Sequence, residues 1–203
     1  ANRARLAQAL GARPVYLQQV HGHVLAELQP ETPDGVAADA CSTRERGVAC
    51  TIMVADCLPV LFTDTRGTRV AGAHAGWRGL AGGVLQSAVA AFVPAVGKPG
   101  GPPMAWLGPC IGPGAFEVGD EVKAAFEGQD AGASACFTPA GSPGKWLADL
   151  PALARQQLAR LGVTQVYGND GSDAWCTVRN ASRFFSHRRD RVSGRFAAAI
   201  WRV

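Results

Sequence analysis

Residues 48–79 (VACTIMVADCLPVLFTDTRGTRVAGAHAGWRG) are the part of the sequence that most restricts the fold. An apolar, β-branched run over 48–55 predicts a buried strand that ends at Asp56. A second strand is predicted over 60–62, because the residue before a proline is held in an extended conformation. After a short turn comes a third apolar run, in which His74 is surrounded by glycine and alanine. Small neighbours leave space beside a ring that can bind a ligand, so we expect a ligand to bind next to His74.

Length and composition set broad limits. The chain of 203 residues is long enough for one domain with a sizeable core. Hydrophobic residues make up 47% and charged residues 18%, which indicates a globular protein. The net charge of +4 suits an anionic small molecule as well as nucleic acid, and does not distinguish between these two classes of ligand. No apolar run reaches the roughly 18 residues of a membrane span. The sequence starts without methionine inside a predicted helix, so we expect the natural N-terminus to lie upstream.

Helical and strand patterns alternate irregularly along the chain, which predicts a mixed α and β class. Apolar residues line one side of 80–93, the clearest predicted helix. The glycine- and proline-rich segment 97–103 is a predicted loop and the best candidate for a subdomain boundary. Further helices are predicted up to Gly11, at 121–126 and at 151–161; strands at 15–17, 104–107, 163–167 and 196–203; a tight turn at 108–114; and loops at 128–144 and 184–191.

Six cysteines occur without any C-x-x-C pair, which argues against a disulfide framework and favours reduced thiols in a cytosolic enzyme. One of them, Cys57, combines with His21 and His74 into a candidate metal-ligand set. All three are predicted at strand ends or in glycine-spaced strands, and their spacing is too long for a zinc finger. Three ligands from separate elements, with an open fourth position, are typical of a catalytic zinc site. The alternative is a buried, apolar Cys57 with histidines that make ordinary hydrogen bonds.

Two further motifs offer chemistry. Gly76-Trp77-Arg78-Gly79 precedes a predicted helix, where free backbone N–H groups and a guanidinium could bind phosphate; a plain turn with a surface arginine is the alternative. Cys110 lies on a sharp glycine–proline turn after a strand, where it could act as a nucleophile with His187 or His74 as base. A turn rich in glycine and proline also needs no catalytic explanation.

Five motifs in one order carry a family resemblance: QVHG at 19–22, ADCLPVLF at 55–62, HAGWRG at 74–79, GPCIG at 108–112 with Phe116-Glu117-Val118 after it, and FFSHRRD at 184–190 with Gly194-Arg195 after it. The chain resembles the multicopper polyphenol oxidase/laccase-domain family, which includes the bacterial peptidoglycan editing factor and the human laccase-domain-containing protein. The resemblance implies an α+β fold of mixed β-sheets layered with helices (α/β/β/α-type) in a single domain, 1–203. The family's N-terminal strand segment with its Gly-Gly-x-Ser motif is not in this sequence.

The resemblance also implies a function and three metal ligands. It implies a mononuclear zinc on His21, Cys57 and His74, phosphorolysis of adenosine, inosine and methylthioadenosine, and deamination of adenosine. We expect purine nucleosides and phosphate as partners, and neither nucleic acid nor a membrane. We expect a cytoplasmic location, and a homodimer is possible. The expected catalytic residues are Cys57, His74, Arg78 and Glu117, and the expected substrate-binding residues are Gln19, Asp39, Asp56, Cys110 and Arg188.

Residue counts restrict the alternatives. A multicopper oxidase needs a type 1 copper and a separate cluster with several more histidines, whereas this chain has 4 histidines. Copper in a single soft site remains an alternative to zinc, and with it a copper-dependent polyphenol oxidase. The His-x-Glu…Pro-Cys-x-x-Cys signature of nucleobase deaminases is absent, so deamination would need another solution. A second alternative is a Cys110-dependent hydrolase or editing factor that acts on peptidoglycan precursors.

Overall fold

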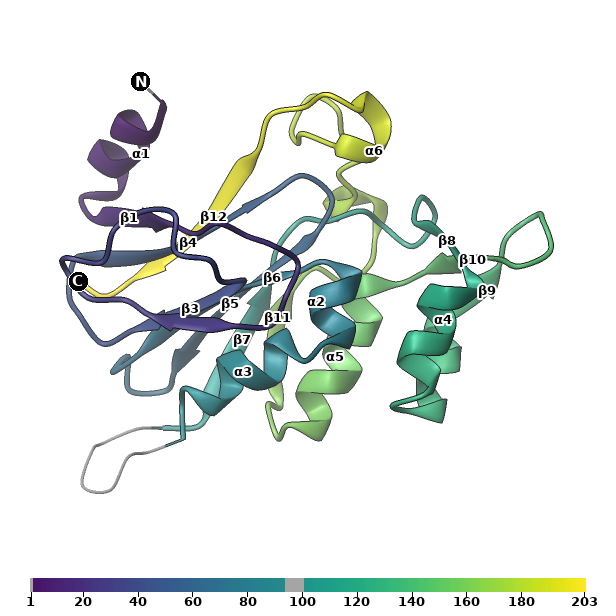
Figure 1. Ribbon diagram of the computed structural model, residues 1–203, viewed down its shortest axis with the longest axis horizontal. Helices are drawn as coiled ribbons and strands as arrows, with labels where there is room; N and C mark the ends of the chain where they lie inside the picture. The colour runs from purple at the N-terminus through teal and green to yellow at the C-terminus, as the bar shows by residue number, and fades with distance from the viewer. Residues whose placement is uncertain (1, 94–100) are drawn as a thin grey trace.

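A six-stranded mixed sheet forms the centre of the computed structural model, which describes residues 2–93 and 101–203 (Figure 1). Most neighbouring pairs in this sheet are antiparallel, and the pairs at its two edges are parallel. In spatial order the strands are β11 (Gln165–Gly168), β7 (Pro103–Leu107), β5 (Leu58–Asp64), β6 (Val70–Ala75), β3 (Ala40–Thr43) and β2 (Leu25–Glu27).

A three-stranded sheet packs on one face of the large sheet. It consists of β1 (Arg13–Tyr16), β4 (Val48–Val54) and β12 (Phe196–Trp201), with β4 in the middle. Buried side chains such as Val15, Ile52 and Val70 fill the space between the two sheets. The sheets come very close at Gly72, where an added Cβ would lie 2.8 Å from a side-chain carbon of Ile52.

Helices cover the opposite face of the large sheet. The helices α2 (Trp77–Ala81), α3 (Val84–Ala90) and α5 (Leu150–Arg160) bury leucines in a cluster that includes Phe62 of the sheet. Asp149 caps α5 by accepting a hydrogen bond from the Ala152 N–H. Pro151 lies in the first turn of α5, where a backbone N–H has no partner within the helix, so proline loses no hydrogen bond there.

The remaining elements lie at the edges of this layered body (Figure 1). A small antiparallel sheet at one end of the molecule has the order β8 (Glu117–Gly119), β10 (Lys145–Ala148), β9 (Phe137–Pro139). Next to it lie α4 (Asp120–Glu127) and the 3₁₀ helix η1 (Ala131–Cys136). The chain also contains α1 (Asn2–Leu10), which buries none of its residues, η2 (Asp173–Trp175) and α6 (His187–Asp190).

The structure confirms the predicted class, a mixed α+β fold of sheets layered with helices. Three local predictions are wrong. The helix expected over 80–93 is two helices, because Gly83 adopts a left-handed φ of 95° between them. The loop expected over 128–144 contains η1 and β9, whose buried side chains pack into the core. The loop expected over 184–191 contains α6, capped by the buried Ser186.

Other sequence predictions can be placed as well. All six cysteines, which lie in the described part of the chain, are free thiols, as expected. Of the candidate subdomain boundary 97–103, residues 97–100 lie outside the described residues. Among the helices of the described residues, none combines the length and the apolar character that crossing a membrane requires.

Candidate metal centre and active site

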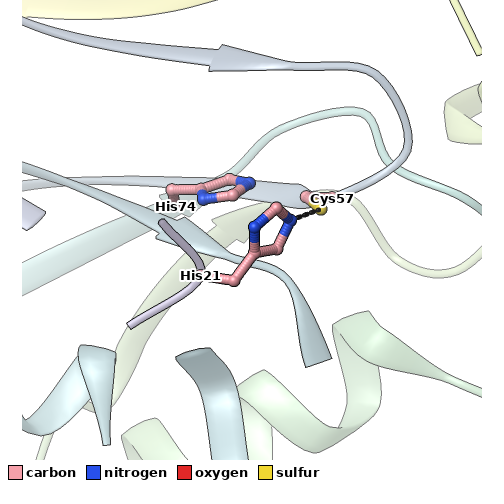
Figure 2. A group of neighbouring side chains, drawn as sticks. All are labelled: His21, Cys57 and His74. Carbon is pink, nitrogen blue, oxygen red and sulfur yellow. Dashed lines mark hydrogen bonds between the residues drawn. The ribbon is translucent and has the colours of Figure 1, made fainter. Parts of the chain in front are cut away.

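Three candidate ligands from distant parts of the sequence meet at one end of the large sheet. The ligand atoms of His21, Cys57 and His74 all lie within 4.8 Å of one another. Figure 2 shows His21 and Cys57 side by side, with 3.8 Å between Nε2 and Sγ, and the His74 ring beside them. The sequence indicates these residues as one candidate ligand set, and the structure brings the three side chains together.

Local chain geometry explains how two of these side chains come together. Strands β5 and β6 are antiparallel, and Pro59 lies opposite His74 in their register. Cys57 directly precedes β5, so its sulfur emerges at the same sheet end as His74. The preceding residue, Asp56, has a φ of 91°, which allows the chain to reverse sharply between β4 and β5.

His21 lies in a loop, where a strand end had been expected. Its φ is 62°, in the left-handed region that few residues other than glycine adopt. The loop is held by the fully buried carboxylate of Asp39, which accepts hydrogen bonds from the backbone N–H groups of Val20, His21 and Gly22. The same carboxylate lies 2.8 Å from Nδ1 of His74. One buried side chain therefore orients two candidate ligands, and Nε2 of His74 faces Cys57 (Figure 2).

Two glycines of the HAGWRG motif make room for this arrangement. A Cβ at Gly76 would lie 3.0 Å from both Sγ of Cys57 and a ring carbon of His21. A Cβ at Gly79 would lie 2.8 Å from the carbonyl oxygen of Gly22, so this glycine lets α2 approach the loop that carries His21. The motif thus supplies one ligand and the space for the other two.

In the metal-free site the electrostatics favour a thiolate on Cys57 and a protonated ring on His74, which must give up a proton when a metal binds. Burial by itself would raise the pKa of the Cys57 thiol, but the two neighbouring histidines outweigh it and lower this pKa to about 7. Burial likewise opposes the charged form of His74, and the hydrogen bond to Asp39 together with Cys57 raises the pKa of His74 to about 9. The Asp39 carboxyl keeps a lowered pKa despite its burial, because His74 and backbone N–H groups donate to it. A thiolate therefore forms readily at this position.

The donor set fits a zinc ion. Two imidazoles and one thiolate are ligands that zinc prefers, and three protein ligands leave one coordination position for water or substrate. The carboxylate behind His74 is the kind of supporting group that zinc-binding histidines usually have. The same soft donors also bind copper, so the geometry does not choose between the two metals.

The three residues open into a cavity of about 480 Å³. This volume is in the range of small-molecule sites. One wall is apolar and includes Ile111, Phe116 and Leu150. Three arginines, Arg78, Arg188 and Arg195, also line the cavity, and so does His187. The Arg78 guanidinium lies 4.4 Å from the centre of the Trp77 ring, so stacking holds it in place without using its donors.

Asp56 is the one acidic side chain among the described residues that line the cavity. Its two oxygens accept hydrogen bonds of 2.6 Å from the Thr177 hydroxyl and from the backbone N–H of Arg188. Its carbonyl oxygen accepts from the Ile111 N–H. Asp56 therefore joins the ligand Cys57 to two other segments that line the cavity.

The other expected site residues lie in different surroundings. Gln19 lines the cavity, but its side-chain amide is paired with the backbone N–H and C=O of Met53. Asp39 lies behind the histidines, where it supports ligands and has no free surface for a substrate. The exposed Glu117 is outside the cavity lining and contributes its backbone carbonyl to Arg188. Cys110 is fully buried, and burial raises the pKa of its thiol far above the ordinary value, which does not suit a nucleophile.

Sequence reasoning overlooked two parts of the site. Arg195 and the apolar wall around Phe116 line the cavity, and neither had been proposed as a binding residue. His187 enters the sequence analysis as a possible base for Cys110. Its position next to Arg188 in the FFSHRRD motif was the signal that could have found it.

A family model described as multi-copper polyphenol oxidoreductase laccase matches residues 1–203. The chain belongs to this family. The chain is 50% identical over 200 residues to a Pseudomonas aeruginosa protein named purine nucleoside phosphorylase PA4543, covering 98% of this chain and 78% of that one. It is 48% identical to the Escherichia coli (strain K12) purine nucleoside phosphorylase YfiH, covering 100% of this chain and 80% of that one.

Solved structures agree with the fold. The crystal structure of Neisseria meningitidis protein NMB0706 matches with a TM-score of 0.86 at 47% identity, covering 98% of this chain and 79% of that one. The Bacillus licheniformis hypothetical protein YfiH matches with a TM-score of 0.88 at 27% identity, covering 100% of this chain and 80% of that one. The family description points to copper oxidation, whereas the names of the relatives point to nucleoside phosphorolysis.

Proposed function

We propose that this protein is a zinc-dependent purine nucleoside phosphorylase acting on adenosine, inosine and methylthioadenosine. The observation that carries the proposal is that His21, Cys57 and His74 open into the same cavity as three arginines. Phosphorolysis needs a site for a phosphate anion next to a site for an apolar, planar base. The cavity offers both, and the relatives' names support this reaction.

Different residues of the cavity suit the two substrates, phosphate and the purine nucleoside. The guanidinium groups of Arg78 and Arg195 are suited to phosphate, because their forked donors match its oxygens. The apolar wall at Phe116 is suited to the purine ring. When bound at the three ligands, a zinc ion would supply a Lewis acid with an open coordination position.

The test uses purified, zinc-loaded protein incubated with inosine, adenosine or methylthioadenosine, with and without phosphate. Chromatography should detect free base and sugar phosphate when phosphate is present. Cys57→Ala should abolish turnover, and Arg78→Ala should raise the KM for phosphate about 10- to 100-fold, since a charged hydrogen bond contributes about 1.5–3 kcal/mol. An absence of product from the zinc-loaded protein, or unchanged turnover in Cys57→Ala, would refute the proposal. Inosine formed from adenosine without phosphate would reveal the deamination that the family resemblance also implies.

Elemental analysis distinguishes the remaining alternatives. About one zinc per chain is expected; copper would instead support the oxidase. Activity that survives chelation and is lost in Cys110→Ser would support a hydrolase acting on peptidoglycan precursors. The six free thiols fit a cytoplasmic location, where cysteines stay reduced.

A further inference from the structure

His187 is the cavity-lining residue whose chemistry the metal site and the phosphate site leave unused. It is the first residue of α6 and lines the same cavity as Cys57. Its side chain is exposed, and within the described part of the chain no hydrogen bond or ion pair engages its ring. An imidazole in a substrate cavity with both nitrogens available is the commonest proton carrier of enzymes.

The other titratable groups of the cavity are already committed. His21, Cys57 and His74 form the candidate metal centre. Both oxygens of Asp56 accept short hydrogen bonds from Thr177 and Arg188, so its side chain is engaged in holding these two segments. The arginines do not lose their protons in proteins. Of the described residues that line the cavity, His187 is therefore the group able to donate a proton to a substrate.

The backbone that carries His187 is held firmly from several sides. Asp56 accepts from the N–H of Arg188, the next residue. Ser186 caps α6 by accepting from the N–H of Arg189. The Arg189 guanidinium donates to the carbonyl groups of Thr177 and Phe184. These contacts fix the place of His187 on the cavity wall while its ring stays unpaired.

Resting on the proposed phosphorolysis, we propose that His187 is the catalytic acid that protonates the departing purine. In this step the bond between C1′ of the sugar and N9 of the base breaks, and its electron pair leaves with the base. N7 of the purine takes the proton of the His187 imidazolium, while an oxygen of inorganic phosphate forms a bond to C1′. The products are the neutral base and the sugar 1-phosphate, and the imidazole regains a proton from water.

The test compares inosine with 7-methylinosine, whose N7 is already methylated and positively charged, so that its base leaves without a proton. His187→Ala and His187→Gln should lower kcat with inosine by roughly 100-fold or more, which is the usual contribution of a general acid. With 7-methylinosine both variants should stay within about threefold of the unmodified protein, because this reaction needs no acid. Val192→Ala, at a residue 93% exposed in the same segment, is the matched control and should leave both reactions unchanged.

The outcomes separate the two proposals. An equal loss with both substrates, at unchanged zinc content and melting temperature, would overturn the acid role and make His187 a binding residue. Unchanged rates with inosine would overturn it as well. If the unmodified protein phosphorolyses neither nucleoside, the proposed function itself is overturned, and the role of His187 with it.

Discussion

At the scale of single residues, the buried carboxylate of Asp39 contacts both histidines of the candidate metal centre. It accepts from the backbone of His21 and lies in hydrogen-bond contact with the ring of His74. We had expected Asp39 to bind substrate. Its position instead makes it the support that determines how two ligands from different segments approach one ion.

Asp39→Asn tests this supporting role. The amide keeps one acceptor oxygen but places an NH₂ group against backbone N–H groups of Val20 and Gly22, so the loop that carries His21 should loosen. We expect zinc affinity to fall about 10- to 100-fold, as in other proteins that lose such a support. Competition with a chromogenic chelator measures the affinity. Asp170→Asn, at an exposed turn, is the control, and equal affinity of the two variants would contradict the role.

A second prediction at this scale concerns the thiol of Cys57. Its pKa of about 7 means that, in metal-free protein, the reactive thiolate is half formed near pH 7, whereas an ordinary thiol reaches this point near 9. Alkylation by iodoacetamide should therefore rise with pH through about 7 and level off above it. Mass spectrometry should place the label on Cys57, because the other five cysteines are buried. A midpoint near 9 would refute the lowered pKa, and bound zinc should protect the thiol.

At the scale of elements, the break between α2 and α3 depends on Gly83. Its φ of 95° is unfavourable for residues with a Cβ, although an added Cβ would meet nothing closer than 3.5 Å. Gly83→Ala should therefore destabilise the protein by about 1–2 kcal/mol from backbone strain alone. Gly83→Asn should lose less stability than Gly83→Ala, because asparagine tolerates this conformation. Urea unfolding curves compare the two, and equal stability of Gly83→Ala and the unmodified protein would contradict the argument.

Prediction from sequence succeeded for helices and strands that carry a strong local signal. The strand over 48–55 and the helix over 151–161 were found because each carries one strong periodic signal, and the helix has proline at its start and glycine after its end. The segment 128–144 lacked such a signal. Its structure depends on Ala133, Cys136 and Phe137, whose burial is decided by packing against distant residues.

At the scale of the whole molecule, a bound metal would join a loop after β1, the start of β5 and the end of β6. Since the ion binds the folded chain, saturation at 100 times its Kd should stabilise the protein by about 2.7 kcal/mol. For a chain of this length that corresponds to a rise in melting temperature of roughly 5–10 °C. Differential scanning fluorimetry with zinc and with chelator measures the shift. Cys57→Ser should respond little to zinc, and a full response in this variant would refute the site.

The sequence by itself determined the class, most strands, and the residue types of the centre, because these follow from local periodicity and from motifs that are contiguous. Only the tertiary structure decided that His21 meets Cys57 and His74, that Asp39 supports the ligands, and that His187 faces the same cavity. These relations join residues that are far apart in the chain. They depend on sheet register, on the close approaches at Gly76 and Gly79, and on which polar groups become buried together.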